Sequence, residues 1–163
     1  MTLAALALSL ALTASAAPAP KAGAAAACKP QKVAKKAKMT FPLGKPITAN
    51  VVDTPASREI GMMCLKKVPA DYGMLFVFPA EMDLNFWMKN TLLSLDIVWI
   101  GADKKVTVVH DRMKKSTVDT PDEKVATAFG RGQYVLELPA GAAARRKLKA
   151  GDQLAFDVEI PPL

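Results

Sequence analysis

The 163-residue chain is long enough for one ordinary domain and too short for two, and its hydrophobic content of 51% allows a real core. The formal net charge of +7 is unevenly distributed, because the first 45 residues hold seven of the 22 basic residues and no acidic one. The rest of the chain therefore has 15 basic and 15 acidic residues, which removes the main argument for nucleic-acid binding.

The first residues are typical of an exported protein. Residues 3–12 form an apolar run too short to span a bilayer, and Ala14-Ser15-Ala16 supplies small residues for cleavage. We therefore predict a signal peptide over residues 1–16, although no basic residue precedes the apolar run. The expected location is the periplasm or the extracellular space. A second hypothesis makes Cys28 a lipid-modified N-terminus that anchors the protein.

Residues 17–40 are rich in Ala, Pro and Lys and show no hydrophobic periodicity, so they are predicted to form a flexible basic linker. Loose contact with an anionic membrane surface is one option for such a linker. The folded domain is then expected over residues 41–163.

Within that domain, short apolar runs separated by turn residues predict a mainly β fold. The first strand is expected over residues 46–53. Thr54 and Pro55 are a capping residue and a proline at the first helical position, so a helix should follow over 55–64. Further strands are predicted at 73–78, 84–89, 95–100, 105–109, 133–138 and 154–160, with a surface loop at 111–126 and a second helix at 139–148. About seven short strands with two short helices favour a β-sandwich or a partly closed, jelly-roll-like barrel.

The two cysteines give little information in the sequence. Cys28 falls in the predicted linker and Cys64 in the domain, so a bridge between them is expected to stabilise little. There is no Cys-x-x-Cys pair, which excludes zinc-ribbon and thioredoxin-type motifs. Cys64 is therefore interpreted as a small buried hydrophobic residue.

The segment 86–91 combines bulky apolar side chains with hydrogen-bonding ones. Trp87 can stack on a flat or apolar ligand, while Asn90 and Thr91 can orient that ligand through hydrogen bonds. We interpret the segment as the rim of a binding pocket. The competing interpretation is a core strand that ends in an Asn-Thr turn.

Two carboxylates lie inside apolar strand segments. Asp96 and Glu137 each need either solvent or a partner, since a buried unpaired charge is very costly. Arg58 and Lys89 are the partners that we expect for Asp96. The alternatives for both acids are a structural ion pair, an exposed strand face, or a polar floor beneath Trp87.

The order and spacing of several motifs closely resemble the uncharacterised family known as domain of unknown function 192, over about residues 46–160. The motifs are Thr54-Pro55, Arg58, Gly61-Met62-Met63, Gly73-Met74-Leu75-Phe76-Val77-Phe78, Phe86-Trp87-Met88-Lys89-Asn90-Thr91, Leu95-Asp96-Ile97, Tyr134-Val135-Leu136-Glu137-Leu138, Gly141 and Gly151-Asp152. The resemblance implies a compact, mainly β sandwich that is often exported or tethered, and it implies no established activity.

The resemblance also indicates which residues belong to the family pattern. These are Arg58, Trp87, Met88, Asn90, Thr91, Asp96 and Glu137, and we take them as the candidate ligand-binding residues. Cys64 and His110 do not match that pattern.

The sequence favours a binding or accessory module of the cell envelope. We expect a monomer without a cofactor whose partner is a small molecule, a glycan or an envelope protein. No complete catalytic constellation is present, because His110 is the only histidine and there is no Gly-x-Ser-x-Gly motif.

Two alternatives to the binding module remain open. The first is a carbohydrate-active hydrolase in which Asp96 and Glu137 act as a carboxylate pair. The second is a soft-metal site, in which methionine and cysteine sulfur atoms bind copper.

Overall fold

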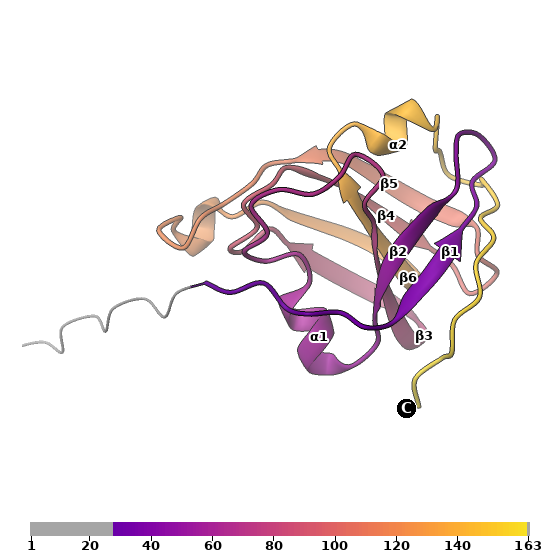
Figure 1. Ribbon diagram of the computed structural model, residues 1–163, viewed down its shortest axis with the longest axis horizontal. Coiled ribbons are helices and arrows are strands. Elements are labelled where there is room, and N and C mark those ends of the chain that lie inside the picture. The colour runs from indigo at the N-terminus through magenta and orange to yellow at the C-terminus, as the bar shows by residue number, and fades with distance from the viewer. Residues whose placement is uncertain (1–27, 163) are drawn as a thin grey trace, which may run out of the picture.

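The computed structural model describes residues 28–162, and the strands of this region form one six-stranded sheet that curls into a half-barrel (Figure 1). The strands are β1 (Lys36–Met39), β2 (Ile47–Val52), β3 (Met74–Trp87), β4 (Leu95–Ile100), β5 (Val106–Met113) and β6 (Thr127–Pro139). Their order is β1-β2-β3-β6-β4-β5, and every neighbouring pair is antiparallel except β2 and β3. The prediction of a mainly β, partly closed barrel is confirmed.

Two short α-helices lie on opposite faces of this sheet (Figure 1). Helix α1 (Pro55–Ile60) and the segment after it cover one face, which we call the α1 face; helix α2 (Ala142–Arg145) covers the other, the α2 face. A 3-10 turn, η1 (Asp122–Lys124), lies in the long connection before β6. Every residue of β4 is buried, because this interior strand is covered on both faces.

The sequence explains where α1 begins and ends. The hydroxyl of Thr54 accepts a hydrogen bond from the backbone N–H of Ser57, and the hydroxyl of Ser57 accepts one from the N–H of Thr54. Pro55 occupies the first turn, as predicted. The helix ends at Ile60 and not at residue 64, because Gly61 adopts a positive φ of 47°.

Strands β3 and β6 bend together, and this bend shapes the α1 face. Four residues separate Val77 from Met82 in β3, whereas one residue separates their partners Tyr134 and Gly132 in β6. Residues Phe78–Glu81 therefore bulge out of the ladder. The side-chain amide of Gln133 donates to the carbonyl oxygens of Phe78 and Pro79, at 3.3 and 3.2 Å. The two strands predicted at 73–78 and 84–89 are therefore one strand with a bulge at Pro79, which has no N–H for the ladder.

Strand β1 was missed, and it lies inside the segment predicted as linker. Its pattern is alternating, with Ala37 and Met39 buried while Lys36 and Lys38 face solvent. The lysines made the segment resemble a solvated linker, although it is a half-buried edge strand. The fold therefore begins at Lys36 or earlier. In contrast, the closing strand predicted at 154–160 is reduced to isolated bridges that pair Ala155 with Thr40 and Gln153 with Lys105.

Other element boundaries shifted by a few residues. Strand β5 continues to Met113, beyond the predicted 105–109, and β6 begins at Thr127, well before residue 133. The second helix is limited to α2, four residues instead of the ten predicted at 139–148. The predicted signal peptide at 1–16 lies outside the described residues. Within residues 28–162, no helix has the length and apolar character needed to cross a membrane.

Candidate functional site

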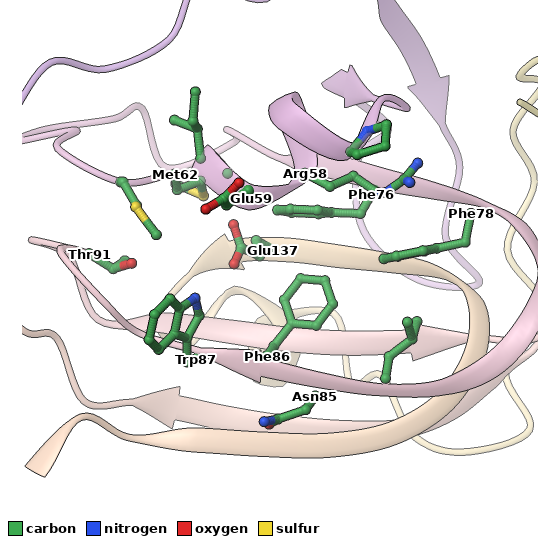
Figure 2. A pocket seen from close by; sticks show the side chains of 15 residues that line it. Arg58, Glu59, Met62, Phe76, Phe78, Asn85, Phe86, Trp87, Thr91 and Glu137 are labelled. Atoms are coloured by element: carbon green, nitrogen blue, oxygen red, sulfur yellow. The ribbon is translucent and has the colours of Figure 1, made fainter. Parts of the chain in front are cut away.

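A cavity of about 280 Å³ opens on the α1 face, between α1 and the bent arms of β3 and β6 (Figure 2). Helix α1 and the turn after it form one wall, and the aromatic side chains of β3 form the other. The lining residues are Pro55, Arg58, Glu59, Ile60, Gly61, Met62, Met63, Phe76, Phe78, Leu84, Asn85, Phe86, Trp87, Thr91 and Glu137. The cavity therefore combines segments that are far apart in the sequence.

Glu137 lies in the middle of this cavity (Figure 2). Its place in β6, opposite Met74 of β3 and Ile97 of β4, directs the side chain to the α1 face. The residue is only 5% exposed, and its Oε2 atom has no hydrogen-bond partner within residues 28–162. Burial raises the pKa of Glu137 to about 8, and the backbone N–H of Met62, which favours the ionised form, offsets only part of this effect. The carboxyl group is therefore mainly protonated at neutral pH.

Aromatic rings form the wall opposite α1. Phe86 makes edge-to-face contacts with Phe76, Phe78 and Trp99, with ring centroids 4.9, 6.4 and 5.5 Å apart. Trp87 stands beside Glu137 and Thr91 at the mouth of the cavity, and 48% of its surface is exposed (Figure 2). The cavity thus has a rigid aromatic interior and one exposed aromatic ring at its entrance.

Arg58 joins α1 to the bulge of β3. One of its guanidinium nitrogen atoms, Nη1, donates to the backbone oxygens of Asp53 and Val77, at 2.7 and 2.9 Å. The guanidinium also lies over the ring of Phe78, 4.7 Å from its centroid. Partial burial lowers the pKa of Arg58. Because these contacts hold the charge at the Phe78 end of the cavity, Arg58 fixes the wall and leaves the region around Glu137 free.

Gly61 is the one glycine that the cavity wall requires. A Cβ atom at this position would lie 2.9 Å from the ring of Phe76, and the φ of 47° is unfavourable for any side chain. The backbone after α1 therefore packs directly on the aromatic wall. This close approach brings Met62 over Glu137.

The turn after β3 holds three of the predicted binding residues, but only Thr91 lines the cavity. Met88 is fully buried in the core, and Asn90 forms the turn itself with a φ of 52°. The backbone oxygen of Asn90 accepts a hydrogen bond from the N–H of Cys64 at 2.9 Å. The hydroxyl of Ser116 donates to the backbone oxygen of Met88 at 2.5 Å. Within this segment, Phe86, Trp87 and Thr91 line the cavity, whereas Met88 belongs to the core.

Asp96 lies on the opposite face from the cavity. Its side chain accepts three backbone hydrogen bonds, from the N–H groups of Arg112, Gly141 and Ala143, at 2.8, 3.0 and 2.8 Å. The carboxylate thus fastens the start of α2 to β4. The predicted partners are wrong: Arg58 binds backbone oxygens on the α1 face, and Lys89 pairs with Asp122.

This placement also removes the proposed hydrolase pair. Asp96 is paired with Leu138 and Ile97 with Glu137, so the two carboxyl groups point to opposite sides of the sheet. They cannot flank one glycosidic bond across a cleft, as a hydrolase of this type requires.

Cys28 and Cys64 form a disulfide, so Cys64 is buried, as predicted, but it is bonded to a second sulfur atom. Cys64 is not a free buried thiol, and its sulfur is not available as a metal ligand. The bridge ties the chain before β1 to the turn after α1, where the side-chain amide of Gln31 also donates to the backbone oxygens of Ser57 and Gly61, both at 2.9 Å. No sequence pattern indicates this arrangement, because residues 28–35 lack hydrophobic periodicity. Within residues 28–162, no cluster of three or more His, Cys, Asp or Glu side chains is arranged to hold a metal ion.

Sequence reasoning named Arg58, Trp87, Thr91 and Glu137, which line the cavity together, but it missed most of the wall. Phe76 and Phe78 could have been found, because alternate residues of a strand share a face and both rings lie two positions apart. The contribution of α1 and of Met62 to the cavity could not have been predicted, since it depends on how the helix packs over the sheet.

Comparisons with known proteins agree with this architecture. One similar crystal structure, at a TM-score of 0.67 and 27% identity, is a protein from Sinorhizobium meliloti 1021 whose description as a transcription regulator is itself provisional; the match covers 77% of this chain and 97% of that one. Another is a protein of unknown function from Novosphingobium aromaticivorans DSM 12444, at a TM-score of 0.61 and 27% identity, covering 80% of this chain and 94% of that one. No curated protein matches the sequence.

The model of one protein family matches residues 36–156, which is most of the chain and includes every strand described above. The family is domain of unknown function 192 (DUF192), described as an uncharacterized ACR. The resemblance seen in the sequence motifs is confirmed, and the chain belongs to the DUF192 family.

Proposed function

We propose that this protein is a ligand-binding module of the cell envelope and that the cavity on the α1 face is its binding site. The observation that carries the proposal is the carboxyl group of Glu137, which is buried at 5% exposure, has an unpartnered oxygen and faces a cavity of about 280 Å³. A buried polar atom without a partner costs roughly 1–3 kcal/mol. A ligand that supplies the missing partner recovers that free energy on binding.

The surroundings of Glu137 favour a small ligand with an apolar part. Phe76, Phe78 and Phe86 provide apolar surface inside, and Trp87 provides a flat platform at the mouth. A few polar groups among aromatic walls are typical of small-molecule sites, where the polar groups set the orientation. A short glycan that stacks on Trp87 fits the same description.

The disulfide supports the assignment to the cell envelope. Such bonds persist in oxidising compartments and are rare where thiols are kept reduced. The bridge also bears on the lipid-anchor hypothesis, because a sulfur atom bonded to Cys64 cannot carry a thioether-linked lipid. Cys28 can therefore carry a lipid or form the disulfide but not both, and the disulfide is the alternative that we propose.

Ligand binding can be tested by adding a panel of envelope sugars, peptidoglycan fragments and small aromatic compounds to the ¹⁵N-labelled protein. We expect binders to shift the amide signals of Met62, Phe86, Trp87 and Thr91. Trp87→Ala should weaken binding at least about tenfold, because stacking area at the mouth is lost. Phe129→Ala is the matched control, since this ring is 67% exposed and lies outside the cavity. Signal changes confined to other surfaces would contradict the proposal.

The location is tested separately, by fractionating cells and measuring the intact mass of the protein. We expect the protein in the envelope fraction, with its N-terminus after residue 16 and two hydrogen atoms missing because of the disulfide. A cytoplasmic, uncleaved and reduced protein would contradict the envelope assignment. A lipid on Cys28 would contradict the disulfide.

A further inference from the structure

The unpartnered oxygen of Glu137 limits the chemistry of a ligand. It lies at the centre of the cavity and lacks a hydrogen-bond donor within residues 28–162. Around it are the rings of Phe86 and Trp87 and the apolar side chain of Met62 (Figure 2). Aromatic faces carry negative electrostatic potential, so they attract cations as well as apolar groups. A positively charged group with N–H donors can therefore bind the free oxygen of Glu137 and also interact favourably with the aromatic rings.

The other charged groups near Glu137 favour the same choice. Glu59 lines the cavity from α1 and repels anions. Arg58 also lines it, but its guanidinium is held by two backbone oxygens and the ring of Phe78 at the far end. Tyr72 is the remaining titratable neighbour; burial raises its pKa, so this phenol stays neutral. A ligand carboxylate would lie near the two acidic side chains Glu59 and Glu137. An ammonium group would have no positively charged side chain beside it at Glu137, because Arg58 is held at the far end of the cavity.

We propose that the cavity binds a primary ammonium group on a short apolar stem, with the carboxylate of Glu137 as its counter-charge. This inference rests on the proposed binding function and specifies its ligand class. The ammonium N–H groups donate to the free oxygen of Glu137, and the stem lies between Phe86 and Trp87. A primary ammonium fits better than a quaternary one, because only the former has N–H groups to donate.

Binding of this kind has a measurable proton balance. At neutral pH the free cavity holds Glu137 mainly in its protonated form, since burial raises its pKa to about 8. The ligand enters with its own positive charge, and the carboxyl group releases its proton to the buffer. The complex is then an ion pair, and close to one proton leaves for each ligand bound at pH 7.

The test compares three probes of one shape in the purified protein at pH 7. These are n-pentylamine, which is fully charged at this pH, its neutral isostere 1-pentanol, and the anion pentanoate. Calorimetry in phosphate and in Tris, two buffers of different ionisation enthalpy, gives the affinity and the number of protons released. We expect the amine to bind at least about tenfold more tightly than the alcohol. Pentanoate should bind most weakly.

Two variants locate the charge. In Glu137→Gln the preference for the amine should fall below about threefold and proton release should disappear. In the control Glu123→Gln, which removes an exposed carboxylate outside the cavity, the preference for the amine and the proton release should both persist. Should Glu137→Gln fail to fold, proton release by the unsubstituted protein decides alone, because Glu137 is the lining carboxyl group whose pKa burial raises to about 8.

The outcomes separate this inference from the function on which it rests. If 1-pentanol binds in the cavity as tightly as the amine, or if no proton is released, the ammonium inference is wrong while the binding module stands. If none of the three probes nor any compound of the panel above perturbs the cavity, both proposals fail.

Discussion

The carboxyl groups of Asp96 and Glu137 lie on opposite faces of the sheet, although they come from the adjacent strands β4 and β6. Their surroundings differ as much as their directions. Asp96 accepts three backbone N–H bonds beneath α2, whereas Glu137 has an unpartnered oxygen in the cavity. One acid therefore holds the start of α2, and the other faces the cavity that we propose as the binding site.

Glu137 makes stability fall as the pH rises. Its folded pKa of about 8 exceeds the unfolded value of 4.5, so between these values the unfolded chain loses a proton that the folded protein keeps. Stability should decrease by up to about 1.4 kcal/mol per pH unit across this window and level off above pH 8. Urea unfolding between pH 4 and 9 measures the slope. Glu137→Gln should remove most of it, and an unchanged slope in that variant would contradict the assignment.

Asp96→Asn should destabilise the protein by about 2–4 kcal/mol. The NH₂ group that replaces one carboxylate oxygen is a donor, so either the N–H groups of Arg112 and Gly141, which bind Oδ1, or the N–H of Ala143, which binds Oδ2, is left without an acceptor. Chemical denaturation measures the loss. Asp83→Asn is the matched control, because that side chain is exposed on β3 and should change stability by less than about 0.5 kcal/mol. Equal effects of the two substitutions would show that Asp96 does not hold α2.

Cys28→Ser should cost on the order of 3–4 kcal/mol. The bridge closes a loop with a sequence separation of 36, and cross-linking such a loop lowers the entropy of the unfolded chain by about this amount. The unsubstituted protein should lose the same stability in reducing buffer, while Cys28→Ser should be insensitive to reductant. A midpoint of unfolding that does not respond to reductant in either protein would contradict the bridge.

The two tryptophans should respond very differently to truncation. Trp99 is fully buried, so Trp99→Ala should cost about 3–5 kcal/mol. Trp87 is half-exposed at the cavity mouth, so Trp87→Ala should cost about 1 kcal/mol and leave a folded protein. Thermal unfolding compares the two variants. Collapse of the fold in Trp87→Ala would place this residue in the core instead.

The sequence predicted the fold class and the interior strands because their signals are local. Strand β4 is an uninterrupted apolar run, and the predicted boundaries at residues 95 and 100 are those observed. Strand β1 was not predicted, because its alternation of polar and apolar residues spans only four positions, two of them lysine. The bulge at Pro79 divided β3 into two apparent strands, since its continuity depends on pairing with β6.

The site could be predicted only in part, for a similar reason. Trp87 and Glu137 could be selected as candidates by their residue types. That Glu137 and Asp96 face opposite sides of the sheet follows only from the register between β6 and β4, which the local sequence does not reveal. Likewise, Gly130 allows the ring of Trp99 to pack on β6, where a Cβ atom would lie 2.6 Å from the ring. Such contacts join positions far apart in the chain, and no pattern within either segment reveals them.

The disulfide has a mechanical consequence for any tether upstream of residue 28. A pull on the N-terminus passes through the two sulfur atoms to Cys64, so residues 29–63, with β1, β2 and α1, lie outside the route of the force. At Cys64 the tension reaches the hydrogen bond between its N–H and the backbone oxygen of Asn90, beside the mouth of the cavity. Tension on the attachment would therefore load the turn at Cys64 and not the edge strand β1.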